Sequence, residues 1–222
     1  MRRAAHPFVF QTGLVLEEST GLRAATLPVL AELLRTVPDA CIYHHTHYFL
    51  LRHHYLTAEP ANDFAYWVTH AVGEERLGGL LAGIDVMEHA SIDGLRTACI
   101  RTVDRYLQRY PAARVRFAQE GQEFFFTSSV HVILPTEQLA ATLAQFRDAL
   151  KAVSVRSLYF HMFDARLRLG QPSNDFARWL TEQLGLAELS AKIARLDPYD
   201  QSLETLRAML LRLVDQQLRA DA

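Results

Sequence analysis

Two sets of tyrosine, histidine and arginine side chains are the groups in this sequence most able to bind or transform a ligand. Each set reads Tyr-x-His and then, seven residues after the histidine, arginine. The members are Tyr43, His45 and Arg52 in the first set and Tyr159, His161 and Arg168 in the second. Arginine presents a planar fork of donors to anions, and histidine changes its charge near neutral pH. We therefore predict ligand binding at these six residues. The alternative interpretation is that they join helices through buried hydrogen bonds, with arginine holding Asp63 or Asp175.

A cluster of histidines overlaps the first set. It consists of His44, His45, His47, His53 and His54. On a helix, His44, His47 and His54 would face the same side, and neutral imidazole is a ligand for zinc and other transition metals. These three are the candidate metal ligands, and the alternative is a polar face without a metal. The second set has Phe160 and Phe163 where the first has His44 and His47, so the cluster is not part of the repeated pattern.

The pattern Asn-Asp-Phe-Ala-x-Trp occurs twice, at residues 62–67 and 174–179. Such a match is expected by chance roughly once in 10^7 pairings at average residue usage. Asparagine is a good N-cap, aspartate suits the first helical turn, and the aromatic residues suit a core. We predict these roles for Asn62, Asp63, Phe64 and Trp67 and for Asn174, Asp175, Phe176 and Trp179. Catalytic acids at the two aspartates are the alternative.

The two copies predict the same series of elements. Residues 8–16 and 123–134 are rich in aromatic and β-branched residues, which favours strands. Matching capping residues predict that helices start at Thr20, Asn62 and Ser91 in the first copy and at Thr136, Asn174 and Ser202 in the second. Further helices are expected over residues 41–55 and 157–169, and Gly73 and Gly185 are the expected C-caps.

The predicted fold class is helix-dominated α+β. It consists of an internal tandem duplication, with a strand and about five helices in each copy, packed as a pseudo-twofold unit with a small sheet. Repeat one covers residues 1–109 and repeat two covers residues 124–222. The connector, 110–123, has room for a short strand over residues 114–117.

Composition sets further limits. The chain has 222 residues, a formal net charge of −2 and 50% hydrophobic residues, as expected of a soluble globular protein. No signal-peptide core or membrane-length apolar run is apparent, and Cys41 and Cys99 are interpreted as core residues, so a cytoplasmic location is expected. Arginines between Arg96 and Arg116 predict a basic ridge, which a solvated helix face explains more simply than nucleic-acid binding does.

The repeated segments resemble a known family. Residues 42–47, 62–67, 157–161 and 175–180 are similar to those of an uncharacterised bacterial and archaeal family, catalogued as a domain of unknown function. The likeness spans nearly the whole chain and includes the duplication. It implies a soluble protein, and it implies no particular activity, cofactor or catalytic residue.

These observations favour a binding or regulatory module whose partner is a small molecule or a protein. The alternatives are a metal-dependent or acid–base enzyme that uses the histidine cluster, and a nucleic-acid-binding protein that uses the arginine ridge. Zinc or another transition metal is the one cofactor that the sequence suggests. The sequence leaves the oligomeric state open.

Overall fold

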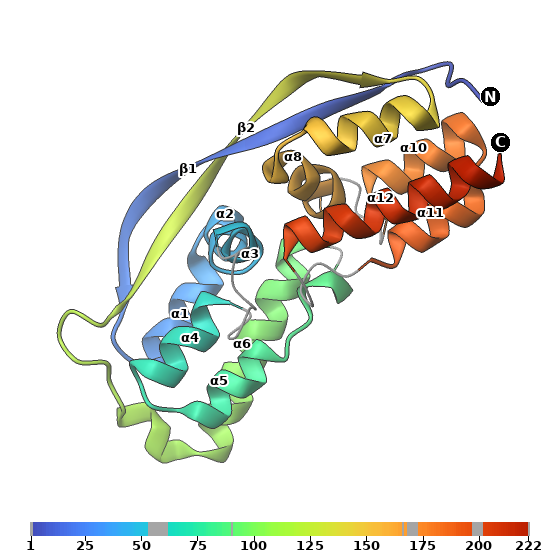
Figure 1. Cartoon of the computed structure of the whole chain (residues 1–222). Coiled ribbons are helices and arrows are strands. Elements are labelled where there is room, and N and C mark those ends of the chain that lie inside the picture. Colours follow the sequence, from blue (N-terminus) through green and yellow to red (C-terminus); the bar gives the residue numbers. More distant parts are fainter. Residues whose placement is uncertain are drawn as a thin grey trace. The chain divides into compact units, whose positions relative to one another are not determined.

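The computed structural model describes residues 2–52, 62–89, 91–165, 167, 173–196 and 202–221 (Figure 1). The first series of elements is β1 (Phe8–Ala24), α1 (Leu27–Thr36), α2 (Asp39–His45), α3 (His47–Arg52), α4 (Asp63–His70), α5 (Glu75–Ala82), η1 (Val86–Glu88) and α6 (Ile92–Arg109). After η2 (Pro111–Val115), the second series is β2 (Phe124–Ala140), α7 (Leu143–Ala152), α8 (Val155–Tyr159), η3 (Phe160–Asp164), α10 (Asp175–Leu184), α11 (Ala187–Ala194) and α12 (Leu203–Ala220). The predicted α+β class with dominant helices is confirmed.

The two strands form a two-stranded antiparallel sheet and run side by side (Figure 1). Each begins with alternating buried and exposed residues, and Phe8, Phe10, Phe124 and Phe126 point into cores. This alternation is what a pleated strand with one covered face requires. Both strands are 17 residues long, which is longer than the sequence analysis predicted.

The predicted helix starts at Thr20 and Thr136 are wrong. Both residues lie inside strands, where the Thr20 hydroxyl donates to the Phe126 carbonyl at 2.6 Å and the Thr136 hydroxyl to the Phe10 carbonyl at 2.8 Å. The actual N-caps are Thr26 and Thr142. Threonine is a favoured N-cap residue, but here a cross-strand hydrogen bond uses the same hydroxyl.

The predicted continuous helices after α1 and α7 are also interrupted. The first ends at His45, and the Thr46 hydroxyl donates to the Ile42 carbonyl at 2.6 Å before α3 begins. The second passes from α8 into a π-helix, η3, at Phe160. In the connector, residues 111–115 form a 3₁₀ helix, and of the short strand predicted over residues 114–117, Phe117 makes an isolated antiparallel bridge with Thr26. Gly185 is the C-cap of α10 with φ 64°, whereas α4 is capped by Ala71, two residues before Gly73.

The chain divides into two compact units. Among the described residues, one unit contains those up to Leu14 and those from His131 onward, and the other contains Val15 to Val130. Each strand therefore contributes one part to each unit. The boundaries of these units differ from those predicted for the two repeats, because a strand adds its starting residues to the helices of the other series.

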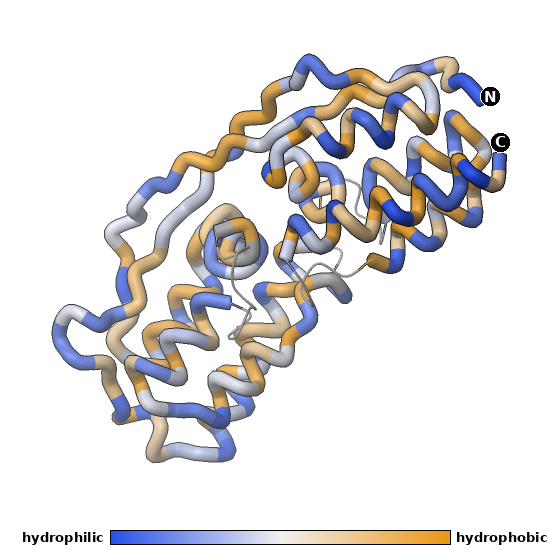
Figure 2. Tube along the Cα trace, in the orientation of Figure 1, coloured by the Kyte–Doolittle hydropathy of each residue, from blue (hydrophilic) through white to orange (hydrophobic). Residues whose placement is uncertain are grey.

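Within each unit, the helices repeat the same order and similar lengths. α1 and α7 have 10 residues each, α5 and α11 have 8, and α6 and α12 have 18. Hydrophobic and hydrophilic residues alternate along these helices, as expected where one face is covered (Figure 2). This order fits the predicted duplication; the pseudo-twofold packing of the copies stays a prediction.

Both cores are rich in aromatic rings. Phe124, Phe126, Phe64 and Trp67 pack around His45 in one unit, and Phe8, Phe10, Phe176, Phe146 and Trp179 lie around His161 in the other. Cys41 and Cys99 are buried and form no disulfide, which agrees with the expected core role. No described helix has the length and apolar character needed to span a bilayer.

Candidate functional site

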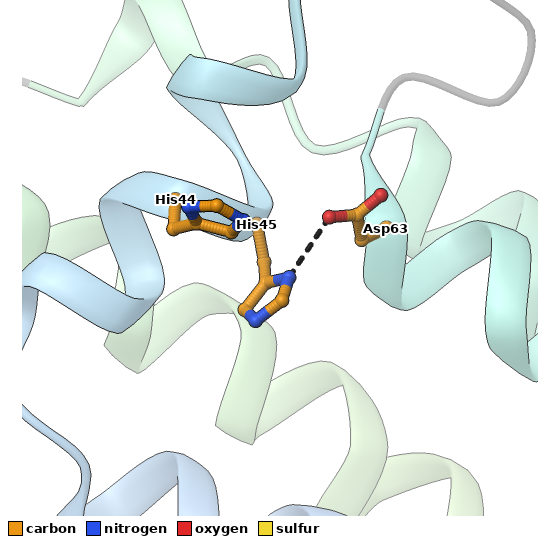
Figure 3. A group of neighbouring side chains, drawn as sticks. All are labelled: His44, His45 and Asp63. Atoms are coloured by element: carbon orange, nitrogen blue, oxygen red, sulfur yellow. Dashed lines mark hydrogen bonds and ion pairs between the residues drawn. The ribbon is translucent and has the colours of Figure 1, made fainter. Parts of the chain in front are cut away.

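His45 links a strand to two helices. It is the last residue of α2, its Nδ1 lies 2.8 Å from Asp63 Oδ2, and its Nε2 accepts a hydrogen bond from the Thr127 amide at 3.0 Å. Figure 3 shows the imidazole reaching Asp63 at the start of α4. A backbone N–H can donate only to a nitrogen that carries no proton. The Nδ1 atom therefore carries the proton and donates to the carboxylate, so the imidazole is neutral.

His161 makes the same arrangement in the other unit. Its Nδ1 lies 2.8 Å from Asp175 Oδ2, and its Nε2 accepts from the Gln11 amide at 2.8 Å. The neighbouring Ser157 hydroxyl donates to the Gln11 carbonyl at 2.6 Å, so both backbone groups of Gln11 are held by α8 and η3. Both histidines are buried, with 4% and 2% exposure. Each histidine thus holds a strand against the first turn of a helix.

Asp63 and Asp175 each bind a histidine, and the predicted arginine contacts of these carboxylates fall on side chains outside the described part. Arg52 is the last residue of α3, and its side chain lies outside the described part, as does the whole of Arg168. Tyr43 and Tyr159 are buried: Tyr43 stacks on His47 at 5.5 Å, and Tyr159 packs on Phe163 at 5.2 Å. The binding role predicted for the two sets stays a prediction, and the described contacts match the structural alternative.

The repeated Asn-Asp-Phe-Ala-x-Trp segments start α4 and α10. The side-chain oxygens of Asn62 and Asn174 each accept from a backbone amide three residues later at 2.8 Å. The aromatic residues of both segments, Phe64, Trp67, Phe176 and Trp179, are buried. The two caps differ at one atom: Asn62 Nδ2 donates to the Leu81 carbonyl at 3.1 Å, whereas Asn174 Nδ2 is buried without a partner among the described residues.

The predicted metal ligands His44, His47 and His54 stay a prediction, and among the described residues a different group of possible ligands lies close together. His54 lies outside the described residues. The possible ligand atoms of His44, His45 and Asp63 lie within 4.8 Å of one another (Figure 3). His44 Nδ1 also lies 2.8 Å from the Ser129 hydroxyl. Both ring nitrogens of His45 already have hydrogen-bond partners, Asp63 at Nδ1 and the Thr127 amide at Nε2. The matching histidine, His161, makes the same two hydrogen bonds although Phe160, which cannot bind a metal, stands where the first copy has His44. Hydrogen bonding therefore accounts for the position of His45 without a metal.

His47 is held neutral by its surroundings. Burial and, to a lesser extent, the nearby charge of His89 together lower the pKa of His47 from 6.5 to about 4. His47 Nδ1 lies 3.1 Å from the Thr46 hydroxyl. Because the ring is 4% exposed, its protonation has to occur inside the core and is coupled to folding.

A pocket of about 250 Å³ lies in the unit that contains His161. Buried Phe8, His161 and Trp179 line it, together with Asp175 at the start of α10. Arg178 and Glu182, one and two turns further along α10, are exposed and line the rim. The pocket therefore combines an aromatic floor with groups of both charges.

Sequence reasoning missed Arg178 and Glu182. Asp175, Arg178 and Glu182 occur at positions i, i+3 and i+7 of the helix that starts at Asn174, so a shared face could have been read from their spacing. Nothing in the spacing indicates that β1 lies opposite this face, since β1 is more than 150 residues earlier in the chain.

The predicted arginine ridge is divided by the fold. Buried Arg96 binds Asp39 at 2.7 Å and the Leu34 carbonyl, and Arg116 binds Glu74 at 2.9 Å. Arg101, Arg105 and Arg109 are exposed on α6 and make no ion pair within the described part of the chain. The remaining exposed stripe is short, and arginine near a helix C-terminus is favoured by the helix dipole.

Comparison with known proteins agrees with the resemblance seen in the sequence. The chain belongs to the family of unknown function DUF5752, whose model matches residues 5–215. Among solved structures, OrfY from Thermoproteus tenax is similar, with 32% identity over 96% of each chain and a TM-score of 0.79. No curated protein matches the chain. The prediction of an uncharacterised family is confirmed, and the description of that family states no activity.

Proposed function

We propose that, as a member of this family of unknown function, the protein is a binding module whose small polar ligand occupies the pocket over His161 and Asp175. The observation that carries this proposal is the combination of a concave site with aromatic walls and charged groups at its rim. Ligand sites are typically apolar clefts with a few polar groups that orient the ligand. The volume of about 250 Å³ suits a small metabolite.

The histidine in this pocket supports binding and argues against acid–base catalysis. A general base needs an accessible nitrogen within hydrogen-bonding distance of the substrate. His161 uses Nε2 for the Gln11 amide and Nδ1 for Asp175, so it offers its ring carbons to the pocket. Its contribution is to fix the wall formed by β1 and α10, which preorganises the site before a ligand arrives.

Tryptophan fluorescence tests this proposal because the two tryptophans lie in different units. Trp179 lines the pocket and donates to the His6 carbonyl at 3.0 Å, and Trp67 donates to the Gln122 carbonyl at 2.7 Å. The variant Trp67→Phe leaves Trp179 as the single reporter, and Trp179→Phe leaves Trp67 as the matched control.

Both variants would be screened against amino acids, carboxylic acids, sugar phosphates and nucleotides. A ligand of the pocket should change the emission of the Trp67→Phe protein and raise its melting temperature, because binding to the folded state stabilises it by mass action. The emission of the Trp179→Phe protein should stay constant. Changes confined to Trp67, or no response from Trp179 to any class, would refute the proposal.

A further inference from the structure

We propose that the ligand of this pocket carries an α-carboxylate beside an amine or amide nitrogen, as a free amino acid or the last residue of a peptide does. This inference rests on the proposed function and specifies the ligand. It is carried by the free edge of β1 and by the charged groups of α10 that lie across the pocket from it.

The edge of β1 that faces away from β2 can be identified from its hydrogen bonds. The Phe10 carbonyl accepts from Thr136 of β2, whereas the Gln11 amide and carbonyl are held by His161 and Ser157. Backbone groups of successive strand residues point to opposite edges. The amide and carbonyl of Val9 therefore point to the same edge as those of Gln11, and Val9 lines the pocket.

Within the pocket, this free edge is one residue long. On the same edge, Pro7 has no N–H to offer, and both groups of Gln11 are already used. Val9 thus supplies one donor and one acceptor at the spacing that pairs with a single residue of an extended chain. Pairing of this kind is how sheet edges bind peptides, and here it accommodates one ligand residue.

Arg178 is the group in the pocket that suits a carboxylate. Its guanidinium is exposed at the rim and makes no hydrogen bond or ion pair with the described residues. Arginine binds carboxylates through two parallel N–H donors. Glu182 lies one turn further along α10 and also lines the pocket, where its carboxylate can accept from an ammonium or amide nitrogen of the ligand. The neighbouring Asp175 Oδ2 is already held by His161.

The matching positions of the other unit lack this chemistry. Tyr66 stands where the second segment has Arg178, and His70 stands where it has Glu182. The Tyr66 and His70 rings pack against each other with centroids 4.5 Å apart. Carboxylate recognition is therefore assigned to the unit of His161, and the two units differ in function although their histidine bonds are alike.

The test compares ligands that differ only at the carboxyl end. The twenty amino acids, their N-acetyl derivatives and the N-acetyl amides would be titrated into the Trp67→Phe protein by calorimetry, with Trp179 emission as a second readout. The carboxylate forms should bind, and the matched amides should bind roughly tenfold or more weakly, because a charge-assisted bond is lost. N-acetyl derivatives that bind as well as the free amino acids would indicate a peptide terminus, and a requirement for the free ammonium would indicate an amino acid; either result supports the proposal.

The variant Arg178→Gln should weaken binding of the carboxylate forms roughly tenfold or more, and binding of the amides should change little. Arg156→Gln is the matched control, because Arg156 is an exposed arginine of α8 in the same unit and does not line the pocket. Equal binding of acids and amides, or an unchanged affinity in Arg178→Gln, would overturn the carboxylate assignment and leave the binding function intact. If Trp179 emission responds to another ligand class and not to carboxylates, the carboxylate assignment fails and the binding function stands. If no ligand class changes Trp179 emission, the proposed binding function fails as well.

Discussion

Replacing His47 by phenylalanine should remove a defined part of the acid sensitivity of this protein. The second series of elements has phenylalanine at the matching position: Phe163 packs on Tyr159 as His47 packs on Tyr43. The Thr46 hydroxyl remains bonded to the Ile42 carbonyl without the imidazole. The substitution therefore removes a titrating group from the core and keeps an aromatic ring beside Tyr43.

The magnitude follows from the two pKa values of His47, 6.5 when exposed and about 4 in the folded protein. Because the folded pKa is the lower one, the unfolded state binds the proton more readily. The stability contribution is fully present above pH 6.5, and it is lost as the pH falls toward 4. The loss is about 2 kcal/mol at pH 5 and at most about 3.4 kcal/mol in stronger acid.

Urea unfolding of both proteins between pH 7.5 and pH 4.5 measures this difference. The wild-type protein should lose about 2 kcal/mol more than His47→Phe on going from pH 7.5 to pH 5. Because the two proteins differ at residue 47 alone, the difference between their pH profiles reports the effect of His47. Parallel pH profiles would refute the reasoning, and so would an NMR titration of His47 with a midpoint near 6.5.

Two further comparisons test the packing. His161→Ala should destabilise the protein by about 2–4 kcal/mol in urea unfolding, because the Gln11 amide and the Asp175 carboxylate each lose a hydrogen bond and a cavity remains. A loss below about 1 kcal/mol would contradict this role. Gly79→Ala should stabilise α5 by about 0.5–1 kcal/mol, because the added Cβ meets nothing within 4 Å. Gly78→Ala should instead destabilise α5, because the added Cβ would lie 1.9 Å from the hydroxyl of Thr69 on α4. Equal effects of the two substitutions would contradict the observed helix contact.

The local features of the fold were predictable because they depend on short-range chemistry. Asn62 and Asn174 cap helices, since an asparagine oxygen three residues before a backbone amide is a local arrangement. The starts of both strands followed from their aromatic and β-branched residues. The strand ends did not, because Thr20 and Thr136 have cap-like surroundings in the sequence and find their partners on the other strand.

The sequence by itself determined the fold class and the two matching series of elements, and it singled out His45 and His161 as candidate residues. Only the tertiary structure decided what these histidines do, because the atoms that fix their protons belong to Thr127 and Gln11, more than 80 residues away in the chain. It also decided that Arg178 and Glu182 line the same pocket as Val9 of β1. Spacing along one helix shows which side chains share a face, and long-range packing alone determines which backbone lies across from it.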